Sequence, residues 1–317
     1  MLHNKKLYPQ GDPSVFDVLG LKDSDSQAQE VWLDLNQLEL VDINHAVFAG
    51  CERIIIYDFF HARPGITPGI VDSVRALRQI APVHWVSTHH LRIDDIPTVR
   101  FDYLWNRTRR AYLEHSPSWK HGPDPADYVQ YPLHWQPRSH RYLCLYNRPE
   151  PFRDRLHRMV QHYQGYWSNR SLGKWLEPNS LNTEDFTLLP RREYLDTSYI
   201  SCQVESTHLS GLGIGFTEKT YDHLIQGRIV LNFGPAGFYQ QLACEGWQLY
   251  HGIDLAWDGI ANDEMRFLAY INCLECLFRL SDLDMHDLFL LNKEIITHNY
   301  RRLEEKPYDY FNGISSS

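Results

Sequence analysis

Short apolar runs alternate with amphipathic stretches along the chain, which is the pattern of an α/β protein. Residues 53–58 form a β-branched run that ends in an acid, as a buried parallel strand does at its carboxyl end. Turn residues follow, then a helical pattern over 70–80 and a second apolar run over 83–88. This strand–helix–strand order predicts a parallel sheet in the N-terminal part of the chain.

A second α/β pattern follows a proline-punctuated segment, residues 106–138, which we interpret as a linker or an irregular crossing between domains. Strands are predicted over 141–146, 199–204 and 228–233. Helices are predicted over 152–163, 218–226, 237–245, 263–279 and 284–305.

The two patterns together predict an α/β fold of two Rossmann-like domains that face each other across a cleft. The expected boundaries are 1–138 for an acceptor-side domain with its linker and 139–317 for a donor-binding domain. Open α/β sheets bind ligands beyond the carboxyl ends of their strands. The segments that this rule selects are 58–63, 88–90, 147–155, 205–219 and 232–237.

The net charge of the chain bears on whether it binds nucleic acid. Lysine and arginine number 31 against 40 aspartates and glutamates, which gives a net charge of −9. Proteins that bind nucleic acid mainly through phosphate contacts are usually basic, so nucleic acid is a disfavoured partner. A basic cluster beside aromatic residues over 106–112 keeps that alternative open.

The chain is expected to be cytoplasmic and without a membrane span. No apolar run approaches the roughly 18 residues that a membrane helix needs, and residues 1–6 lack the apolar core of a secretory signal. The chain has six cysteines, too few for its length to indicate a disulfide framework. Cys273 and Cys276 form a C-x-x-C pair with no neighbouring ligands, and their three-residue helical spacing favours packing in the core.

The most informative segment spans residues 211–222, where three glycines precede Thr217-Glu218-Lys219. Glycines allow a tight backbone path, and Thr217 has the side chain of a helix N-cap. Free N–H groups at a helix start, together with Lys219, can bind a phosphate, and a nearby carboxylate can accept hydrogen bonds from a ribose. The alternative is a flexible loop followed by an ordinary capped helix with solvated charges.

A second candidate segment spans residues 147–155 and joins a strand end to a helix start. Arginine in this position can hold a phosphate through two parallel N–H bonds. The alternative is a solvated first turn, in which Arg153 and Arg155 pair with Asp154 or Glu150.

The order of these segments resembles the donor-binding half of glycosyltransferases with the GT-B fold, in particular the fucosyltransferase-like proteins and related phage and bacterial glycosyltransferases. The resemblance covers about residues 140–250. It rests on the following residues, in chain order: Asn147-Arg148-Pro149, Arg153, Glu205, Phe216-Thr217-Glu218-Lys219-Thr220, the strand over 228–233 with Gly234, and Leu242 with Gly246-Trp247.

The resemblance implies a role for each matching residue. Lys219 would contact the donor diphosphate and Glu218 the ribose. Arg153 would be the second cation on the departing diphosphate, with Arg155 as its alternative, and Glu205 matches a family acid near the sugar. The substrate-binding residues expected on this basis are Asn147, Arg153, Arg155, Gly215, Thr217, Glu218 and Lys219.

The implied activity is transfer of a hexosyl or pentosyl group from a nucleotide sugar to an acceptor hydroxyl on a glycan or another molecule, with inversion. Fixed cations can stabilise the leaving diphosphate, so no metal or cofactor is expected. The Asp-x-Asp pairs at 23–25 and 282–284 do not follow strand runs, as a metal-binding pair in that class should. The other interpretations are transfer to a modified base in nucleic acid and a non-catalytic protein that binds a nucleotide or a glycan.

The catalytic base should come from the N-terminal half. Asp58 and His61 follow one predicted strand, and His89 and His90 follow the next. Asp58 is the first choice, because a carboxylate beyond a strand end faces the expected cleft. The expected catalytic residues are therefore Asp58, His61 and Glu205.

Overall fold

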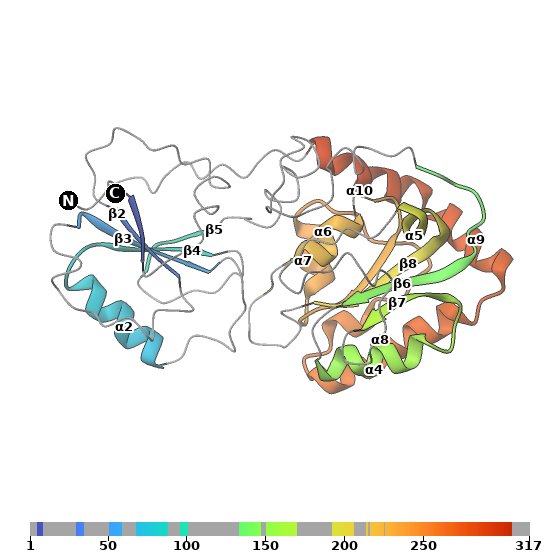
Figure 1. Ribbon diagram of the computed structural model, residues 1–317, viewed down its shortest axis with the longest axis horizontal. Coiled ribbons are helices and arrows are strands. Elements are labelled where there is room, and N and C mark those ends of the chain that lie inside the picture. The colour runs from blue at the N-terminus through green and yellow to red at the C-terminus, as the bar shows by residue number, and fades with distance from the viewer. Residues whose placement is uncertain are drawn as a thin grey trace. The chain divides into compact units, whose positions relative to one another are not determined.

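The structure is a computed structural model that describes residues 5–8, 30–34, 51–58, 68–87, 96–100, 133–146, 150–169, 192–205, 214, 216–224 and 226–305. These residues form an α/β architecture with two parallel sheets, which lie in two compact units (Figure 1). None of the helices in this part of the chain combines the length and the apolar character that a membrane crossing needs.

The first unit carries a five-stranded sheet in which every pair of neighbouring strands is parallel. Its strands are β1 (Lys5–Tyr8), β2 (Glu30–Asp34), β3 (Arg53–Asp58), β4 (Val83–Ser87) and β5 (Thr98–Arg100). They lie side by side in chain order, so the strand order does not reverse anywhere among the described strands.

Helix α2 (Pro68–Arg78) covers one face of this sheet with Ile70, Val74 and Leu77. These side chains pack in one cluster with residues of β2, β3 and β4, namely Val31, Leu33, Ile54, Ile56, Val83 and Trp85. Alternate residues such as Ile55 are buried on the other face. Burial on both faces explains why these strands are apolar without alternation.

The second unit carries a four-stranded parallel sheet made of β6 (His140–Tyr146), β7 (Gly165–Asn169), β8 (Ser198–Val204) and β9 (Ile229–Phe233). The strands are ordered β7-β6-β8-β9. The chain therefore moves outward from β6 to β7, and then continues on the other side of β6 with β8 and β9. The strand order reverses between β6 and β8.

Helices cover both faces of the four-stranded sheet. They are α4 (Pro151–Val160), α5 (Arg192–Thr197), α6 (Glu218–Leu224), α7 (Phe238–Cys244), the 3₁₀ helix η4 (Ala256–Gly259), α8 (Asp263–Phe278), α9 (Asp282–Leu291) and α10 (Lys293–Glu305). Figure 1 shows α4 and α8 on one face, and α6 and α10 on the other.

The face that carries α4 and α8 is packed with aromatic rings. Phe233 of β9 lies 5.4 Å from Phe152 of α4, and 5.1 Å and 5.6 Å from Phe267 and Tyr270 of α8, between ring centroids. Tyr142 of β6 lies 5.3 Å from Phe278 at the end of α8. Offset and edge-to-face ring contacts of this kind add to the free energy gained by burying the rings.

The outer edge of β9 is closed by side-chain hydroxyl groups. The Tyr239 hydroxyl accepts from the Asn232 N–H at 2.7 Å and donates to the Asn232 carbonyl at 3.1 Å, while the Tyr250 hydroxyl donates to the Arg228 carbonyl at 3.1 Å. Burial raises the pKa of both tyrosines, so the hydroxyls keep their protons. These bonds satisfy backbone groups that an edge strand otherwise leaves open to pairing.

Most of the predicted elements are confirmed. The strands and helices expected near β3, α2, β4, β6, α4, β8, α6, β9, α7 and α8 are present. The single helix expected over 284–305 is wrong, because α9 ends at Leu291 and α10 begins at Lys293. Asn292 lies at the interruption as the C-cap of α9, and its side-chain amide accepts from the His251 N–H at 2.6 Å and donates to the His251 carbonyl at 3.0 Å. The division at residue 138 stays a prediction, as does the Rossmann-like character of the two expected domains.

Candidate functional site

The strand order of the four-stranded sheet reverses between β6 and β8, and we expect a ligand to bind at the carboxyl ends of these strands. Open α/β sheets form their ligand crevice where the strand order reverses, because the connections on either side of that point lie on opposite faces. Here α4 begins a few residues after β6, on one face, and α6 lies on the other face between β8 and β9. The side chains at the starts of α4 and α6 are therefore the first candidates for ligand contact.

Helix α4 contributes Arg153, whose side chain is only 6% exposed. Its Nε lies 3.4 Å from the carbonyl oxygen of Val204, the last residue of β8, so the guanidinium lies beside the carboxyl end of that strand. The Glu150 carboxylate caps α4 by accepting from the N–H groups of Phe152 at 3.1 Å and Arg153 at 2.9 Å. The cap occupies N–H groups that an incoming phosphate would otherwise use.

Arg155, the alternative cation, is directed at α8. Its Nη1 lies 2.6 Å from a carboxylate oxygen of Glu264, and its guanidinium lies 4.7 Å from the centre of the Phe267 ring. These contacts tie α4 to α8. Arg155 is thus directed toward α8, whereas the Arg153 guanidinium lies beside the carboxyl end of β8.

Helix α6 contributes Lys219. The Thr217 hydroxyl accepts from the Lys219 N–H at 3.2 Å, so the predicted N-cap is present. The helix has only seven residues, or about two turns. A dipole that short is weak, so we expect the Lys219 ammonium to contribute most of the positive charge at this helix start.

Glu205 follows β8 directly and is fully buried. Its two carboxylate oxygens accept hydrogen bonds from the hydroxyls of Thr217 and Thr220, in the cap and first turn of α6. A buried carboxylate is stable only when its oxygens are paired, and these two threonines provide that pairing. The contacts connect the end of β8 to the start of α6.

Asn232 of β9 extends this network. Its side-chain Nδ2 donates to the Thr220 hydroxyl at 2.9 Å and to the Lys219 carbonyl at 3.1 Å. The carboxyl ends of β8 and β9 are thereby joined to the first turn of α6 by hydrogen bonds through Glu205 and Thr220.

The last turn of α6 is held by a second polar contact. Nε2 of the Gln203 amide lies 2.6 Å from Nε2 of the buried His223 ring. Burial, followed by the charges of Arg228 and Lys219, holds the pKa of His223 well below its usual value. The ring is therefore neutral, and its Nε2 can accept from the Gln203 amide.

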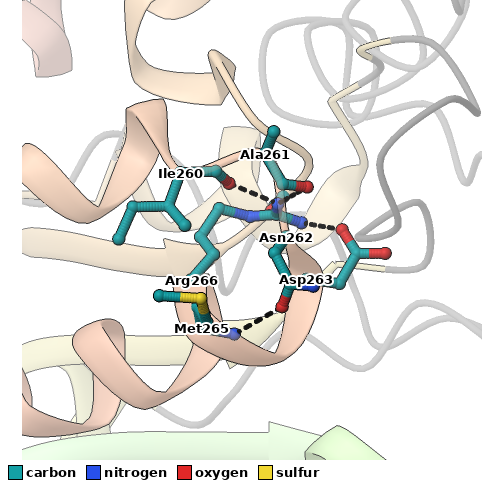
Figure 2. Close-up of polar contacts among 7 residues, drawn as sticks. Ile260, Ala261, Asn262, Asp263, Met265 and Arg266 are labelled. Carbon is teal, nitrogen blue, oxygen red and sulfur yellow. Dashed lines mark hydrogen bonds and ion pairs between the residues drawn. The ribbon is translucent and has the colours of Figure 1, made fainter.

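The turn after β9 is held by Arg266 of α8, and Figure 2 shows the contacts of its guanidinium with Ile260, Ala261 and Asp263. The buried guanidinium donates to the carbonyl of Gly234 at 3.1 Å, to the carbonyl of Ile260 at 2.8 Å, and to the Asp263 carboxylate at 2.7 Å. A Cβ at Gly234 would meet the Phe238 ring at 2.3 Å, so only glycine fits this position without rearrangement. Arg266 is thus fully engaged in holding backbone at the carboxyl end of β9.

The structure brings Arg153, Glu205, Thr217 and Lys219 together around the carboxyl end of β8. Glu218 is the first residue of α6. Asp58 is the last residue of β3, in register with Ser87 of β4. The expected site residues His61, Asn147 and Gly215 lie outside the described residues, as do His89, His90 and the basic cluster over 106–112.

Of the two Asp-x-Asp pairs, the one at 23–25 lies outside the described residues, and both carboxylates of the pair at 282–284 have partners. Asp282 pairs with Arg141 at 2.8 Å, and the Asp284 carboxylate accepts from the Ser281 hydroxyl at 2.6 Å at the start of α9. Within the described ranges, no three His, Cys, Asp or Glu side chains are grouped so that they could hold a metal ion. The core placement expected for the C-x-x-C pair is wrong, because Cys273 is half-buried and Cys276 is exposed on α8.

Our interpretation of the sequence missed the polar contacts between α6 and the sheet. The signal is present: Ser201, Gln203 and Glu205 alternate along β8 and its end, while Thr217, Thr220 and His223 recur every three residues at and along α6. The first spacing places polar side chains on one face of a strand, and the second places them on one side of a helix. Matched polar stripes of this kind predict a hydrogen-bonded contact between the two elements.

Comparisons with protein-family models, with curated proteins and with solved structures find no significant match to this chain.

Proposed function

We propose that this chain is a glycosyltransferase that binds a nucleoside diphosphate sugar at the carboxyl edge of the four-stranded sheet. One observation carries the proposal: the strand order reverses between β6 and β8, and Arg153 and Lys219 are carried by the helices on the two sides of that point. The order of these elements along the chain also resembles the donor-binding half of the GT-B glycosyltransferases.

The cations would act on the leaving group. When a sugar is transferred, negative charge builds on the departing diphosphate, and fixed positive groups in a crevice lower the energy of that state. The Arg153 guanidinium can donate two parallel N–H bonds to phosphate oxygens, and the Lys219 ammonium supplies a compact charge. We expect these side chains, rather than the helix N-termini, to stabilise the leaving group, since Glu150 already caps α4 and α6 is short.

Transfer also needs a base that takes the proton of the acceptor hydroxyl. We assign this role to Asp58, with His61 as the alternative. The position of Asp58 at the carboxyl end of β3 supports the assignment, because that edge of a parallel sheet is where side chains can reach a ligand. The expected consequence is that Asp58→Asn abolishes transfer but leaves donor binding unchanged.

The burial of Glu205 favours a second candidate, a non-catalytic nucleotide-binding protein. The acid expected near the sugar has both oxygens bonded to threonines and no exposed surface, so it offers no free group to a substrate. Transfer activity then depends entirely on the N-terminal half. Hydrolysis of a nucleotide sugar separates the candidates, because only a protein that stabilises the departing diphosphate accelerates transfer of the sugar to water.

Calorimetric titration with UDP, GDP, CDP and their sugars tests the proposal. We expect one nucleoside diphosphate to bind the unaltered chain, and Lys219→Ala to weaken that binding by on the order of tenfold or more, since a charge-assisted contact is lost. Lys293→Ala, on α10, is the control for a general loss of positive charge. Absence of binding by all three nucleotides and their sugars would contradict the proposal.

A further inference from the structure

Both backbone polar groups of Lys219 are held by side chains from other positions. The Lys219 N–H donates to the Thr217 hydroxyl at 3.2 Å, and the Lys219 carbonyl accepts from Nδ2 of Asn232 at 3.1 Å. Within a two-turn helix, such bonds fix where the backbone of this lysine lies. The position from which its long side chain starts is therefore set by its neighbours.

The two holding groups meet at one buried carboxylate. Thr217 donates its hydroxyl to Glu205 directly, while Asn232 is joined to Glu205 through the Thr220 hydroxyl. Both Glu205 and Asn232 are fully buried. Hydrogen bonds between buried groups are strong and costly to leave unmade, so this network resists displacement of the first turn of α6.

We infer that Glu205 and Asn232 are positioning residues, which place Lys219 for contact with the diphosphate and do not touch the substrate themselves. The inference rests on the proposed function and adds to it. A lysine side chain has a flexible four-carbon stem, and ordering it costs conformational entropy. A rigid attachment point lowers the entropy cost of each phosphate contact. Glu205 is fully buried and its oxygens face Thr217 and Thr220, so from this place in the network it does not reach a sugar.

A matched control lies at the other end of the same helix. Gln203, like Glu205, projects from β8 toward α6, but its partner is His223 in the last turn. Gln203→Met removes a buried polar contact of α6 while leaving the bonds to Lys219 intact. A purely structural role for the polar network predicts the same outcome for Asn232→Ala and Gln203→Met, whereas positioning of Lys219 predicts different outcomes.

The experiment compares the affinities of a nucleoside diphosphate and its parent nucleoside, measured by calorimetry, for the unaltered chain, Asn232→Ala, Gln203→Met and Lys219→Ala. The nucleotide used is whichever of UDP, GDP and CDP binds the unaltered chain most tightly. We expect Asn232→Ala to weaken diphosphate binding by on the order of tenfold and to leave nucleoside binding unchanged. Gln203→Met should leave both affinities unchanged, and Asn232→Ala should have no further effect when added to Lys219→Ala.

Several results would overturn the inference. Equal weakening of diphosphate and nucleoside binding by Asn232→Ala would indicate general disruption. Weakening by Lys219→Ala alone would overturn the inference but leave the proposed function standing, and failure of the unaltered chain to bind any of the three nucleotides would overturn both. Should Asn232→Ala fail to fold, Glu205→Gln takes its place, because it keeps the shape of the side chain while disturbing the bonds to Thr217 and Thr220.

Discussion

The two faces of the four-stranded sheet are packed by different kinds of contact. On the face that carries α4 and α8, Phe233 of β9 packs against rings of both helices, and Tyr142 of β6 packs against Phe278 of α8. On the opposite face, α6 is joined to β8 and β9 by hydrogen bonds of Thr217, Thr220 and His223. Ring contacts therefore characterise the side of α4 and α8, where Arg266 and Tyr270 also donate to the carbonyls of Gly234 and Leu231, while hydrogen bonds to Glu205, Asn232 and Gln203 characterise the side of α6.

The two kinds of contact contribute differently to the free energy of folding and to the positions of side chains at the candidate site. Burial of apolar rings contributes most of the free energy of folding, but it tolerates changes in position when volume is kept. Hydrogen bonds between buried groups contribute less net stability, but they specify distance and direction. We therefore expect substitutions on the aromatic face to unfold the unit, and substitutions on the polar face to alter binding more than stability.

The largest effect on stability should come from Phe233→Ala. This side chain is fully buried between rings of α4 and α8, so its loss removes apolar contact and leaves a cavity. We expect the free energy of unfolding to fall by about 3–5 kcal/mol, measured by chemical denaturation. Leu268→Ala, on the exposed side of α8, is the control and should leave it nearly unchanged, and equal effects would contradict the distinction.

Arg266→Met should have the next largest effect. The substitution keeps most of the side-chain volume but removes the donors that hold Gly234 and Ile260, and it removes the ion pair with the partly buried Asp263 carboxylate. Loss of one member of a buried pair is costly, and we expect a decrease of about 3 kcal/mol in the free energy of unfolding. Arg279→Met, at the exposed end of α8, should produce no measurable change in the same experiment.

On the polar face, Thr220→Val should have a moderate effect. Valine matches threonine in shape, but it leaves a Glu205 oxygen and an Asn232 amide hydrogen without this partner. Unsatisfied buried groups of this kind cost about 1–3 kcal/mol. Thr297→Val, on the outside of α10, is the control, and a smaller loss for Thr220→Val than for Thr297→Val would show that the network does not hold α6.

The smallest effect concerns His223 and pH. Because the folded pKa lies below the unfolded value of about 6.5, unfolding takes up a proton as the pH falls below that value. The contribution of His223 to stability is thus complete above about pH 6.5 and decreases at lower pH, by about 1 kcal/mol between pH 7 and 5.5. His223→Gln should reduce the pH dependence of unfolding by that amount, and identical profiles would indicate that the buried ring does not titrate on unfolding.

Local sequence patterns were enough to predict most of the elements that position the candidate site. The strands β6, β8 and β9 are apolar runs, and α4 shows helical spacing of apolar residues. The short edge strand β7 was missed, because Gly165–Asn169 is not an apolar run and is defined by its pairing with β6. The break between α9 and α10 was missed, and the contact that lies there, between Asn292 and His251, joins residues that are distant in sequence.

The sequence was enough to select the residues of the candidate site, but not to predict the hydrogen bonds between them. Thr217 as a helix cap and Lys219 in the first turn follow from short-range patterns. The bonds between Glu205 and two threonines join residues 12 and 15 positions apart in sequence, and the bridge through Asn232 connects the ends of two strands. Such contacts become visible only when the sheet order is known, and they change the assignment of Glu205 from a substrate-contacting acid to a positioning residue in our proposal.

The most direct test of the account is a crystal structure of the chain with the tightest-binding of UDP, GDP and CDP. The account predicts the diphosphate at the carboxyl ends of β6 and β8, within hydrogen-bond distance of Arg153 and Lys219, with Glu205 still bonded to Thr217 and Thr220. A diphosphate bound away from both Arg153 and Lys219 would contradict it.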